Sequence, residues 1–298
     1  MMDGILNIYK ERGFTSHDVV AKLRGILRMK KIGHTGTLDP DACGVLPVCL
    51  GRATKVCGLL TDKRKTYETT LLLGIETDTQ DAGGQCQKKR PVEVSDERIR
   101  QTIESFVGDG WQVPPMYSAV KVNGKRLYEL AREGKTIERK PRPVRFYEIE
   151  ILSIEQPRVR LRVTCSKGTY IRTLCHDIGQ ALGCGGCMET LLRTQVGPYR
   201  LEDSVTLDQI QALALAGQAE DQLHPVDSLF ADYEACRIRP DYEKYMYNGN
   251  ALEPGWLLPG KERPLRIRLY TPEGRFFGLY VYRADEERYR LEKMFYGG

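Results

Sequence analysis

Hydrophobic residues alternate with polar ones in several stretches of the chain, which is the pattern of half-buried β-strands. The clearest case is RVRLRVTC, residues 158–165, in which apolar residues alternate with three arginines and a threonine. One face of this strand is therefore expected to be buried and the other to be basic. Similar strands are predicted at residues 4–10, 66–74, 144–154, 265–270, 275–282 and 288–295.

Four other stretches carry apolar residues three and four positions apart, which places those residues on one face of an α-helix. These stretches are 16–29, 95–108, 171–183 and 206–217. Ser16, Ser95 and Thr206 are the predicted N-caps, and Thr206 forms a capping box with Gln209. Gly108 is the predicted end of the second helix. Strands and helices do not alternate regularly, so the sequence predicts an α+β fold rather than a doubly wound parallel sheet.

Three less regular segments connect these elements. Residues 117–134 predict a strand, a turn at Asn123-Gly124 and a short basic helix. The segment TDTQDAGGQ, residues 77–85, predicts a polar loop, and residues 223–230 predict a linker.

The composition is ordinary for a globular protein, with 41% hydrophobic and 29% charged residues in a chain of 298. No run of eighteen apolar residues is present, so no membrane-spanning segment is predicted. The N-terminal stretch lacks the basic start, apolar core and small-residue cleavage site of a signal peptide. We therefore expect a cytoplasmic protein without a membrane partner.

Nine cysteines are present, and in a cytoplasmic protein they are expected to be free thiols. Cys184 and Cys187 enclose two glycines, and with Cys175 and His176 upstream they are compatible with a zinc site. A structural zinc site usually has two spaced pairs of ligands, whereas Cys175 and His176 are adjacent. The favoured interpretation is therefore ordinary thiols and no metal.

The net charge is only +5, but it is unevenly distributed. Residues 121–145 hold nine Lys or Arg against three Glu, whereas residues 201–236 hold eight Asp or Glu and no Lys or Arg. A basic segment of this kind fits a polyanionic partner such as RNA, and the alternative is a solvated surface. The acidic segment is expected to be a solvated connection.

The stretch GHTGTLDP, residues 33–40, places one carboxylate in a loop of small residues. Pro40 favours an extended backbone at Asp39, and Gly33 and Gly36 allow a ligand or another backbone to come close. The glycines form neither a P-loop nor a GxGxxG motif, so ATP or NAD chemistry has no support. Asp39 is therefore a candidate for the floor of a cleft, and the alternative is an aspartate that caps a turn.

A second stretch, SKGTYIRTL at residues 166–174, supplies partners that a working carboxylate needs. Tyr170 and Arg172 are two positions apart, and in an extended segment they would lie on one side. An arginine can hold a carboxylate by two hydrogen bonds and keep it ionised, and a tyrosine ring can stack on a base.

Five motifs occur in a fixed order along residues 4–200, and together they closely resemble the bacterial TruB family, the tRNA pseudouridine-55 synthases. The motifs are GHTGTLDPDACGVLPVCLGRATK, KTYE, PPMYSAVKVNGKRLYELAREG, SKGTYIRTLCHDIGQALGCGG and LLRTQVGPY. The resemblance implies a large mixed, mainly antiparallel sheet with flanking helices and a central RNA-binding cleft. It implies a catalytic domain at 1–235, with a thumb-like basic insertion at about 115–143, and a small PUA-like β domain that binds RNA at 236–298.

The same resemblance assigns roles at the candidate site. Asp39 corresponds to the nucleophile, and Arg172, with Tyr170 beside it, to the arginine that pairs with it. Tyr67, in KTYE, corresponds to the tyrosine that stacks on the flipped base. His34 corresponds to the histidine that occupies the space left by the target nucleotide.

Further contacts are implied around the site. Leu191 and Arg193, in LLRT, correspond to cleft-lining residues, and Arg193 is expected to bind RNA. Lys10 remains from the family motif D-K-P-x-G-x-T-S, whose aspartate and proline are replaced here. The cations expected to hold RNA on the thumb are Lys121, Lys125, Arg126, Arg132 and Lys135.

The resemblance therefore implies an enzyme that isomerises uridine 55 in the T arm of tRNA to pseudouridine, acts as a monomer and is able to assist tRNA folding. The reaction cuts the C1′–N1 bond, turns the uracil and joins C5 to C1′, so it needs no cofactor, no nucleotide and no metal. One carboxylate suffices, attacking either uracil C6 or ribose C1′, and the base must first leave its stack. Two alternatives are a noncatalytic RNA-binding or RNA-folding protein, and an N-glycosidase that releases uracil.

Overall fold

A mixed sheet of nine strands forms the larger part of the computed structural model, which describes residues 2–122, 124–259 and 263–296. The strand order is β1-β3-β12-β4-β11-β10-β7, with β2 paired to β3 and β13 paired to β12. The strands are β1 (Gly4–Lys10), β2 (Ile32–His34), β3 (Cys43–Leu50), β4 (Lys65–Leu73), β7 (Gly108–Gln112), β10 (Arg142–Glu155), β11 (Arg158–Cys165), β12 (Gly186–Val196) and β13 (Tyr199–Arg200). The pairings are antiparallel except that of β3 with β12, so the predicted mainly antiparallel sheet is confirmed.

The parallel junction between β3 and β12 depends on one glycine. Gly44 pairs with Arg193 across the junction and has φ of +105°, which residues with a Cβ rarely adopt. A Cβ at this position would also collide with the carbonyl oxygen of Arg193. The close approach of the two strands therefore requires a glycine here.

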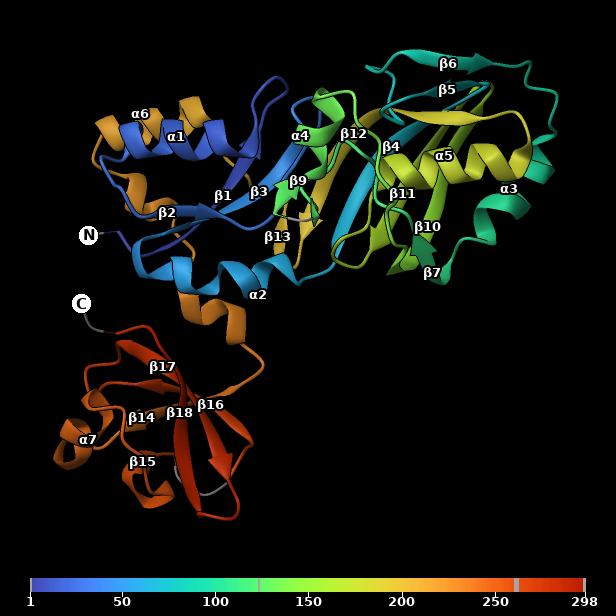
Figure 1. Ribbon diagram of the computed structural model, residues 1–298. Helices are drawn as coiled ribbons and strands as arrows, with labels where there is room; N and C mark the ends of the chain where they lie inside the picture. The colour runs from blue at the N-terminus through green and yellow to red at the C-terminus, as the bar shows by residue number, and fades with distance from the viewer. Residues whose placement is uncertain (1, 123, 260–262, 297–298) are drawn as a thin grey trace.

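Two pairs of helices cover the large sheet, and the last helix, Glu243–Tyr247, packs instead with the C-terminal strands (Figure 1). The helices are α1 (Ser16–Ile26), α2 (Cys57–Thr61), α3 (Asp96–Glu104), α4 (Leu127–Arg132), α5 (Ile171–Leu182), α6 (Leu207–Leu215) and α7 (Glu243–Tyr247). Figure 1 shows α1 and α6 together at one end of the sheet, and α3 and α5 over the strands at the other end. Short 3₁₀ helices occur at η1 (Gly51–Val56), η2 (Ala219–Gln222), η3 (Val226–Phe230), η4 (Pro240–Tyr242) and η5 (Pro254–Trp256).

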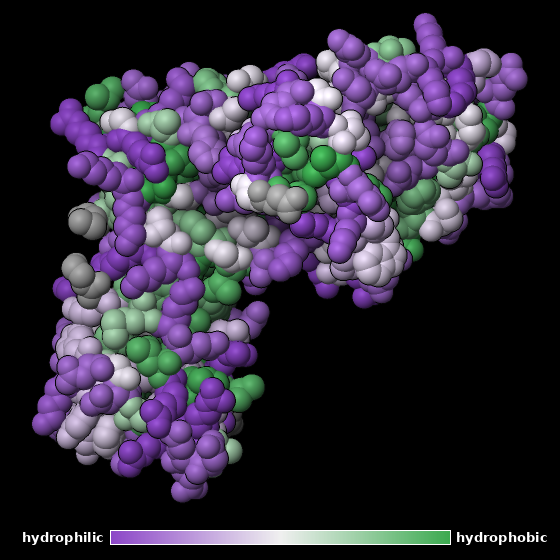
Figure 2. All heavy atoms as spheres, viewed as in Figure 1, coloured by the Kyte–Doolittle hydropathy of each residue, from purple (hydrophilic) through white to green (hydrophobic). Residues whose placement is uncertain are grey.

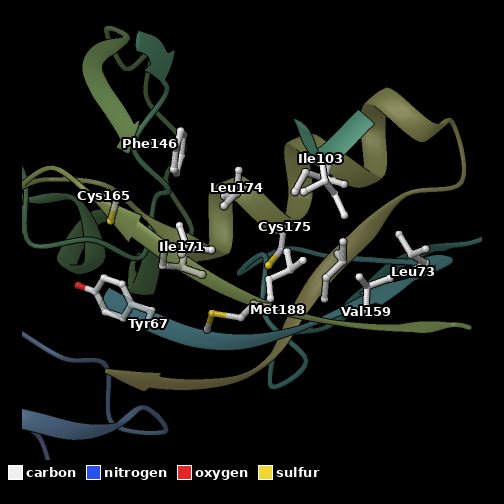
Figure 3. Close-up of a cluster of buried hydrophobic side chains, with 14 of the residues drawn as sticks. Tyr67, Leu73, Ile103, Phe146, Val159, Cys165, Ile171, Leu174, Cys175 and Met188 are labelled. Atoms are coloured by element: carbon white, nitrogen blue, oxygen red, sulfur yellow. The ribbon is translucent and has the colours of Figure 1, made fainter. Parts of the chain in front are cut away.

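Each helix group buries its own apolar core against the sheet. Under α5 and α3, Ile171, Leu174 and Ile103 pack onto strand residues that include Tyr67 and Val159, as Figure 3 shows. Under α1 and α6, Leu23 and Ile210 are fully buried in a second core. The apolar–basic alternation predicted for β11 is confirmed, because its apolar side chains are buried and its three arginines are exposed.

Two small hairpins extend from the large sheet. One pairs β5 (Ile75–Thr77) with β6 (Cys86–Lys89), and the other pairs β8 (Lys121–Val122) with β9 (Lys125–Arg126). The second hairpin and α4 fall within residues 115–143, the segment expected to form a thumb, and they lie in front of the middle of the sheet in Figure 1. We call this segment the thumb. Figure 2 shows a mostly hydrophilic face, with hydrophobic surface gathered near the middle of the view where α4 lies.

A second sheet of five strands forms a separate small unit, seen at the lower left of Figure 1. Its order is β15 (Leu257–Leu258), β14 (Glu234–Ile238), β16 (Arg266–Tyr270), β17 (Phe276–Arg283) and β18 (Arg288–Met294). Leu279 and Phe295 of this unit pack with Ile5 and Val45 of the large sheet in one apolar cluster. The second sheet begins at Glu234, two residues before the predicted boundary.

The N-cap prediction for the first helix was wrong by one residue. Thr15 is the N-cap and forms a capping box with Asp18. Ser16 lies inside the helix, and its buried hydroxyl accepts a hydrogen bond from the Leu38 amide at 2.9 Å. The serine is therefore engaged by the loop that carries Asp39 rather than by its own helix.

Two other predicted N-caps are confirmed, and one predicted helix end differs from the observed end by a few residues. Ser95 and Thr206 are N-caps as predicted, the latter with the capping box to Gln209. The helix after Ser95 ends at Glu104 rather than at Gly108, which opens β7. The predicted linker contains the 3₁₀ helix η3, and in the predicted Asn123-Gly124 turn the asparagine lies outside the described residues. Among the described residues, no helix is both long and apolar enough to cross a membrane.

Candidate active site

Asp39 lies in the loop between β2 and β3, and buried groups fasten this loop on both sides of it. Lys10, at the end of β1, is fully buried and donates from Nζ to the carbonyl oxygens of Pro40 at 3.1 Å and Ala42 at 2.6 Å. The Leu38 amide donates to Ser16 on the other side. Burial lowers the pKa of Lys10, and its three carbonyl contacts make it an anchor for the loop backbone.

Arg172 holds the carboxylate of Asp39 from one side. Nε lies 3.1 Å from Oδ2 and Nη2 lies 3.4 Å from Oδ1, so the guanidinium makes a planar two-point contact. The arginine side chain is 6% exposed, whereas that of the aspartate is 41% exposed, which leaves the carboxylate open on its outer side. Burial raises the pKa of Asp39, and the charge of Arg172 opposes that increase.

The backbone around Arg172 differs from the prediction. Tyr170 and Arg172 do not lie on one side of an extended segment, because Tyr170 is the N-cap of α5 and Arg172 is in its first turn. The helix directs Arg172 toward Asp39, and the half-buried Tyr170 stays at the junction. Burial raises the pKa of Tyr170.

Two other segments complete the contacts of Arg172. Nη2 donates to the carbonyl oxygen of Tyr117, at the base of the thumb, at 2.9 Å. Nη1 lies 3.3 Å from the carbonyl oxygen of Thr79 and 3.3 Å from Oδ2 of Asp81. The guanidinium of Arg172 therefore lies between two carboxylates, those of Asp39 and Asp81.

Asp81 and Gln112 are site residues that the sequence did not single out. Asp81 lies in the loop expected only to be polar, and its Oδ1 accepts from the Thr79 hydroxyl at 2.9 Å. Gln112, at the end of β7, bonds both backbone groups of Tyr170, donating to its oxygen at 3.1 Å and accepting from its amide at 3.0 Å. For Asp81, the only indication in the sequence was the cluster of Thr and Asp residues in the loop at 77–85. Nothing in the sequence indicated a role for Gln112.

Tyr67 is the third residue of β4 and lies at the edge of the large apolar core. The side chain is 7% exposed, and burial raises its pKa to about 12, so the phenol remains protonated. Leu191 is half-buried against the same core. Figure 3 places the Tyr67 ring beside Ile171, at the end of α5 that carries Arg172.

Arg193 does not lie where the prediction placed it. It pairs with Tyr67 across β12 and β4, is 1% exposed, and donates from Nε to the carbonyl oxygen of Val45 at 2.7 Å. A guanidinium this buried is not available to RNA phosphates, so the expectation that Arg193 binds RNA is corrected. It joins the parallel strands β3 and β12 beneath the Asp39 loop.

His34 lies at the end of β2, at the start of the same loop. Its ring makes an edge contact with His17 of α1, with centroids 5.2 Å apart and planes at 75°. Its Nδ1 is buried and has no hydrogen-bond partner among the described residues. Burial, and then the charge of His17, lower the pKa of His34, which favours the neutral ring.

The expected RNA-binding cations lie on the thumb. Lys121, Lys125, Arg132 and Lys135 are exposed or partly exposed, and Arg126 is half-buried. Lys125 and Lys135 share one carboxylate, Glu133, at 3.4 and 2.7 Å. Arg126 and Arg132 lie over the ring of Tyr128, at 5.7 and 5.4 Å from its centroid. The surface therefore keeps an excess of positive charge in front of the site.

The nine cysteines are free thiols in this structure, and Cys184 and Cys187 are buried. Burial raises the pKa of Cys187 to about 11, so it remains a thiol. Within residues 2–122, 124–259 and 263–296, no group of three or more His, Cys, Asp or Glu is arranged to hold a metal ion.

Solved structures with the same fold define the class of protein. The chain matches Cbf5 in a Cbf5-Nop10-Gar1 complex with a TM-score of 0.73 and 29% identity, over 99% of this chain and 85% of that one. It matches a chain of an H/ACA RNP bound to a substrate RNA containing 2′-deoxyuridine with a TM-score of 0.72 and 27% identity, over 99% and 85%. The fold is that of a pseudouridine synthase, an enzyme that isomerises uridine to pseudouridine.

Sequence comparison narrows the class to one family. Residues 24–171 match the TruB family pseudouridylate synthase N-terminal domain, and residues 172–231 match the tRNA pseudouridylate synthase B C-terminal domain. The chain is 51% identical to tRNA pseudouridine synthase B of Lachnoclostridium phytofermentans, over 99% of this chain and all of that protein. It is 48% identical to the protein of that name in Clostridium novyi, over 98% and 99%. The chain belongs to the TruB family, so the resemblance carried by the motifs is confirmed.

Proposed function

We propose that this chain isomerises uridine 55 in the T arm of tRNA to pseudouridine, with Asp39 as the nucleophile. The observation that carries the proposal is the two-point contact of Arg172 with an otherwise open Asp39 carboxylate. Relatives named tRNA pseudouridine synthase B, which match along nearly the whole chain, support tRNA as the substrate.

The geometry suits a carboxylate that must attack a carbon atom while ionised. Arg172 stabilises the charged form, and the anchors at Lys10 and Ser16 fix the direction in which the carboxylate points. Attack on uracil C6 or on ribose C1′ is followed by breakage of C1′–N1, rotation of the uracil and formation of C5–C1′. C5 then loses its proton and N1 takes one up, which restores the C5=C6 double bond and keeps the product an isomer, and the carboxylate is released unchanged.

Base flipping explains the aromatic side chains around Asp39. Tyr67 is held by the sheet beside the α5 end that carries Arg172, which suits a ring that stacks on the extruded uracil. His34 begins the Asp39 loop, and burial lowers its pKa and so favours the neutral ring, which suits a side chain that fills the space left in the RNA stack without burying a charge.

The thumb suits a clamp on the RNA backbone. Its base touches the site directly, since the Tyr117 carbonyl oxygen accepts from Arg172. Its outer side carries the cations Lys121, Lys125, Arg126, Arg132 and Lys135. Closure over the T-arm stem would therefore be coupled to the position of the arginine that holds Asp39.

We further propose how the chain is divided into domains, its oligomeric state and where it acts. The catalytic domain is residues 1–235, and residues 236–298 form a PUA-like unit that adds RNA contacts. The enzyme acts as a monomer in the cytoplasm, without cofactor.

Incubation with an unmodified tRNA transcript, followed by mapping of pseudouridine, tests the proposal. The expected product is pseudouridine at position 55 and at no other uridine of the T loop. RNA binding without any conversion would favour the noncatalytic RNA-binding alternative, and release of free uracil would favour the N-glycosidase.

A further inference from the structure

Three of the eight exposed large hydrophobic side chains among the described residues lie within one stretch of seven residues, on and beside the edge strand β7. Trp111 is 70% exposed, Val107 45% and Val113 41%. β7 is the last strand of the large sheet, and Trp111 lies opposite Pro143 of β10. Exposed apolar surface gathered on a sheet edge is unfavourable in water unless a partner uses it.

Trp111 points away from the Asp39 site. Its neighbour Gln112 is buried and bonds the backbone of Tyr170, and successive side chains of a strand point to opposite faces. Trp111 therefore lies on the opposite face of β7 from Gln112, and we call this face of the sheet the outer face.

Cations and a second aromatic ring continue from Trp111 across this outer face. Arg145 follows Pro143 two positions later, and its guanidinium carbon lies 5.6 Å from the ring centroid of Tyr147. Arg64, just before β4, lies 3.9 Å from the same ring. We call Trp111, Arg145, Tyr147 and Arg64 the aromatic–arginine row.

The charges of the row are weakly compensated, unlike those farther along the same face. Among the described residues, Arg64 has no carboxylate within ion-pair distance, and Arg145 has only the exposed Asp109 at 3.7 Å. At the other end, Arg158 pairs with Glu189 at 2.7 Å, and Arg162 lies within 2.9 Å of two glutamates. The paired end is a solvated, neutral surface, whereas the row presents net positive charge between aromatic rings.

We propose that the aromatic–arginine row binds RNA, with Trp111 stacking on an unpaired base of the tRNA outside the T loop. Arginines interleaved with aromatic rings match the phosphates and bases of a single-stranded segment. Trp111 lies on the face of β7 opposite Gln112, whose side chain holds Tyr170 beside the Asp39 site, so we place the row beyond the nucleotides of the T loop that occupy that site. The row therefore contacts a different part of a tRNA whose T loop is already held at the Asp39 site. This inference rests on the proposed function and extends it to a second contact with the same tRNA.

Tryptophan fluorescence tests the stacking directly, because the chain has only two tryptophans. Trp256→Phe removes the other one and keeps the stack on Tyr242, whose ring is 4.6 Å away. In this variant, an unmodified full-length tRNA transcript is expected to quench Trp111 emission, and an isolated T-arm stem-loop to leave it nearly unchanged. Equal emission with and without saturating tRNA would overturn the proposal.

Affinity measurements on matched variants provide the second test. Trp111→Ala is expected to raise the dissociation constant for full-length tRNA roughly fivefold or more, with that for the T-arm stem-loop within about twofold. Trp111→Phe keeps an aromatic ring and should retain most of the affinity. It is the control that separates loss of stacking from misfolding, because only the loss of a ring should weaken binding. Arg160→Ala, on the same face at the ion-paired end, should leave both affinities within about twofold.

Three further outcomes distinguish RNA binding by the row from protein binding at the same face and from failure of the proposed function. If Trp111→Ala leaves tRNA affinity unchanged but abolishes concentration-dependent self-association, the face binds protein and the proposal is wrong. Binding and quenching need no turnover, so an inactive protein whose Trp111 is quenched would contradict the proposed function alone. An active protein without quenching would contradict the row alone.

Discussion

Arg172 contacts both oxygens of Asp39, with Nε 3.1 Å from Oδ2 and Nη2 3.4 Å from Oδ1. The opposite corner of the same guanidinium meets Asp81 at 3.3 Å. One buried cation thus orients the candidate nucleophile while a second carboxylate orients the cation.

Asp39→Asn should abolish pseudouridine formation while tRNA affinity stays within several-fold. The amide keeps the shape of the side chain but is not nucleophilic. Asp41→Asn is the matched control and should keep its activity, since Asp41 is 76% exposed and, within the described residues, pairs only with the exposed Arg12 at 3.5 Å. Single-turnover assays check both variants, and sustained turnover by pure Asp39→Asn protein would show that another group attacks.

Arg172→Lys should reduce the single-turnover rate by about 100-fold, although the positive charge is kept. Lysine cannot make the planar two-point contact, so the carboxylate would lose its orientation. Thermal unfolding of the variant checks that the fold survives loss of the contacts to Tyr117 and Thr79. A near-normal rate would mean that charge alone is sufficient.

Asp81→Asn should lower the rate and shift the acid limb of the pH–rate profile to lower pH. The charge of Asp81 raises the pKa of Asp39, so its removal lowers that pKa, and the ionised nucleophile persists to more acidic conditions. Asp78→Asn is the control, because Asp78 shapes the same loop through the Gln85 amide but does not touch Arg172. An acid limb that stays in place would show that the charge of Asp81 does not act on Asp39.

Replacement of Lys125, Arg126, Arg132 and Lys135 by alanine should weaken tRNA binding and flatten its salt dependence. Each lost phosphate contact removes roughly 0.7–0.9 from the slope of log affinity against log salt concentration. The choice of target uridine should not change, because phosphate contacts do not read bases. Lys88→Ala with Lys89→Ala, on exposed β6, is the control pair. If the plots of log affinity against log salt concentration coincide for the wild type and the thumb variant, the thumb cations are only a solvated surface.

Gly44→Ala should destabilise the protein far more than Gly13→Ala. Both glycines have positive φ, at +105° and +89°, but a Cβ at Gly44 would collide with Arg193, whereas nothing lies within 4 Å of one at Gly13. The control substitution should cost about 1 kcal/mol of unfolding free energy, and Gly44→Ala several times more. Denaturant unfolding midpoints measure the difference, and equal losses would show that β3 and β12 can separate without cost.

Local patterns in the sequence were sufficient for the elements and for the main candidates of the site. The alternation in β11 and the capping box of α6 involve residues only two or three positions apart, so they act before any tertiary contact forms. The small-residue loop around Asp39 and the order of the five motifs likewise lie along the chain, and they predicted the family.

Tertiary structure decided which side chains meet and which are hidden. Arg172 joins Asp39 and Asp81 across 133 and 91 positions, and Gln112 reaches Tyr170 across 58, so no local pattern carries these pairs. Arg193, in LLRT, was expected to line the cleft and bind RNA, yet the parallel pairing of β12 with β3 encloses it and leaves it 1% exposed. Burial depends on which strands become neighbours, and the sheet order is set by the packing of the whole chain.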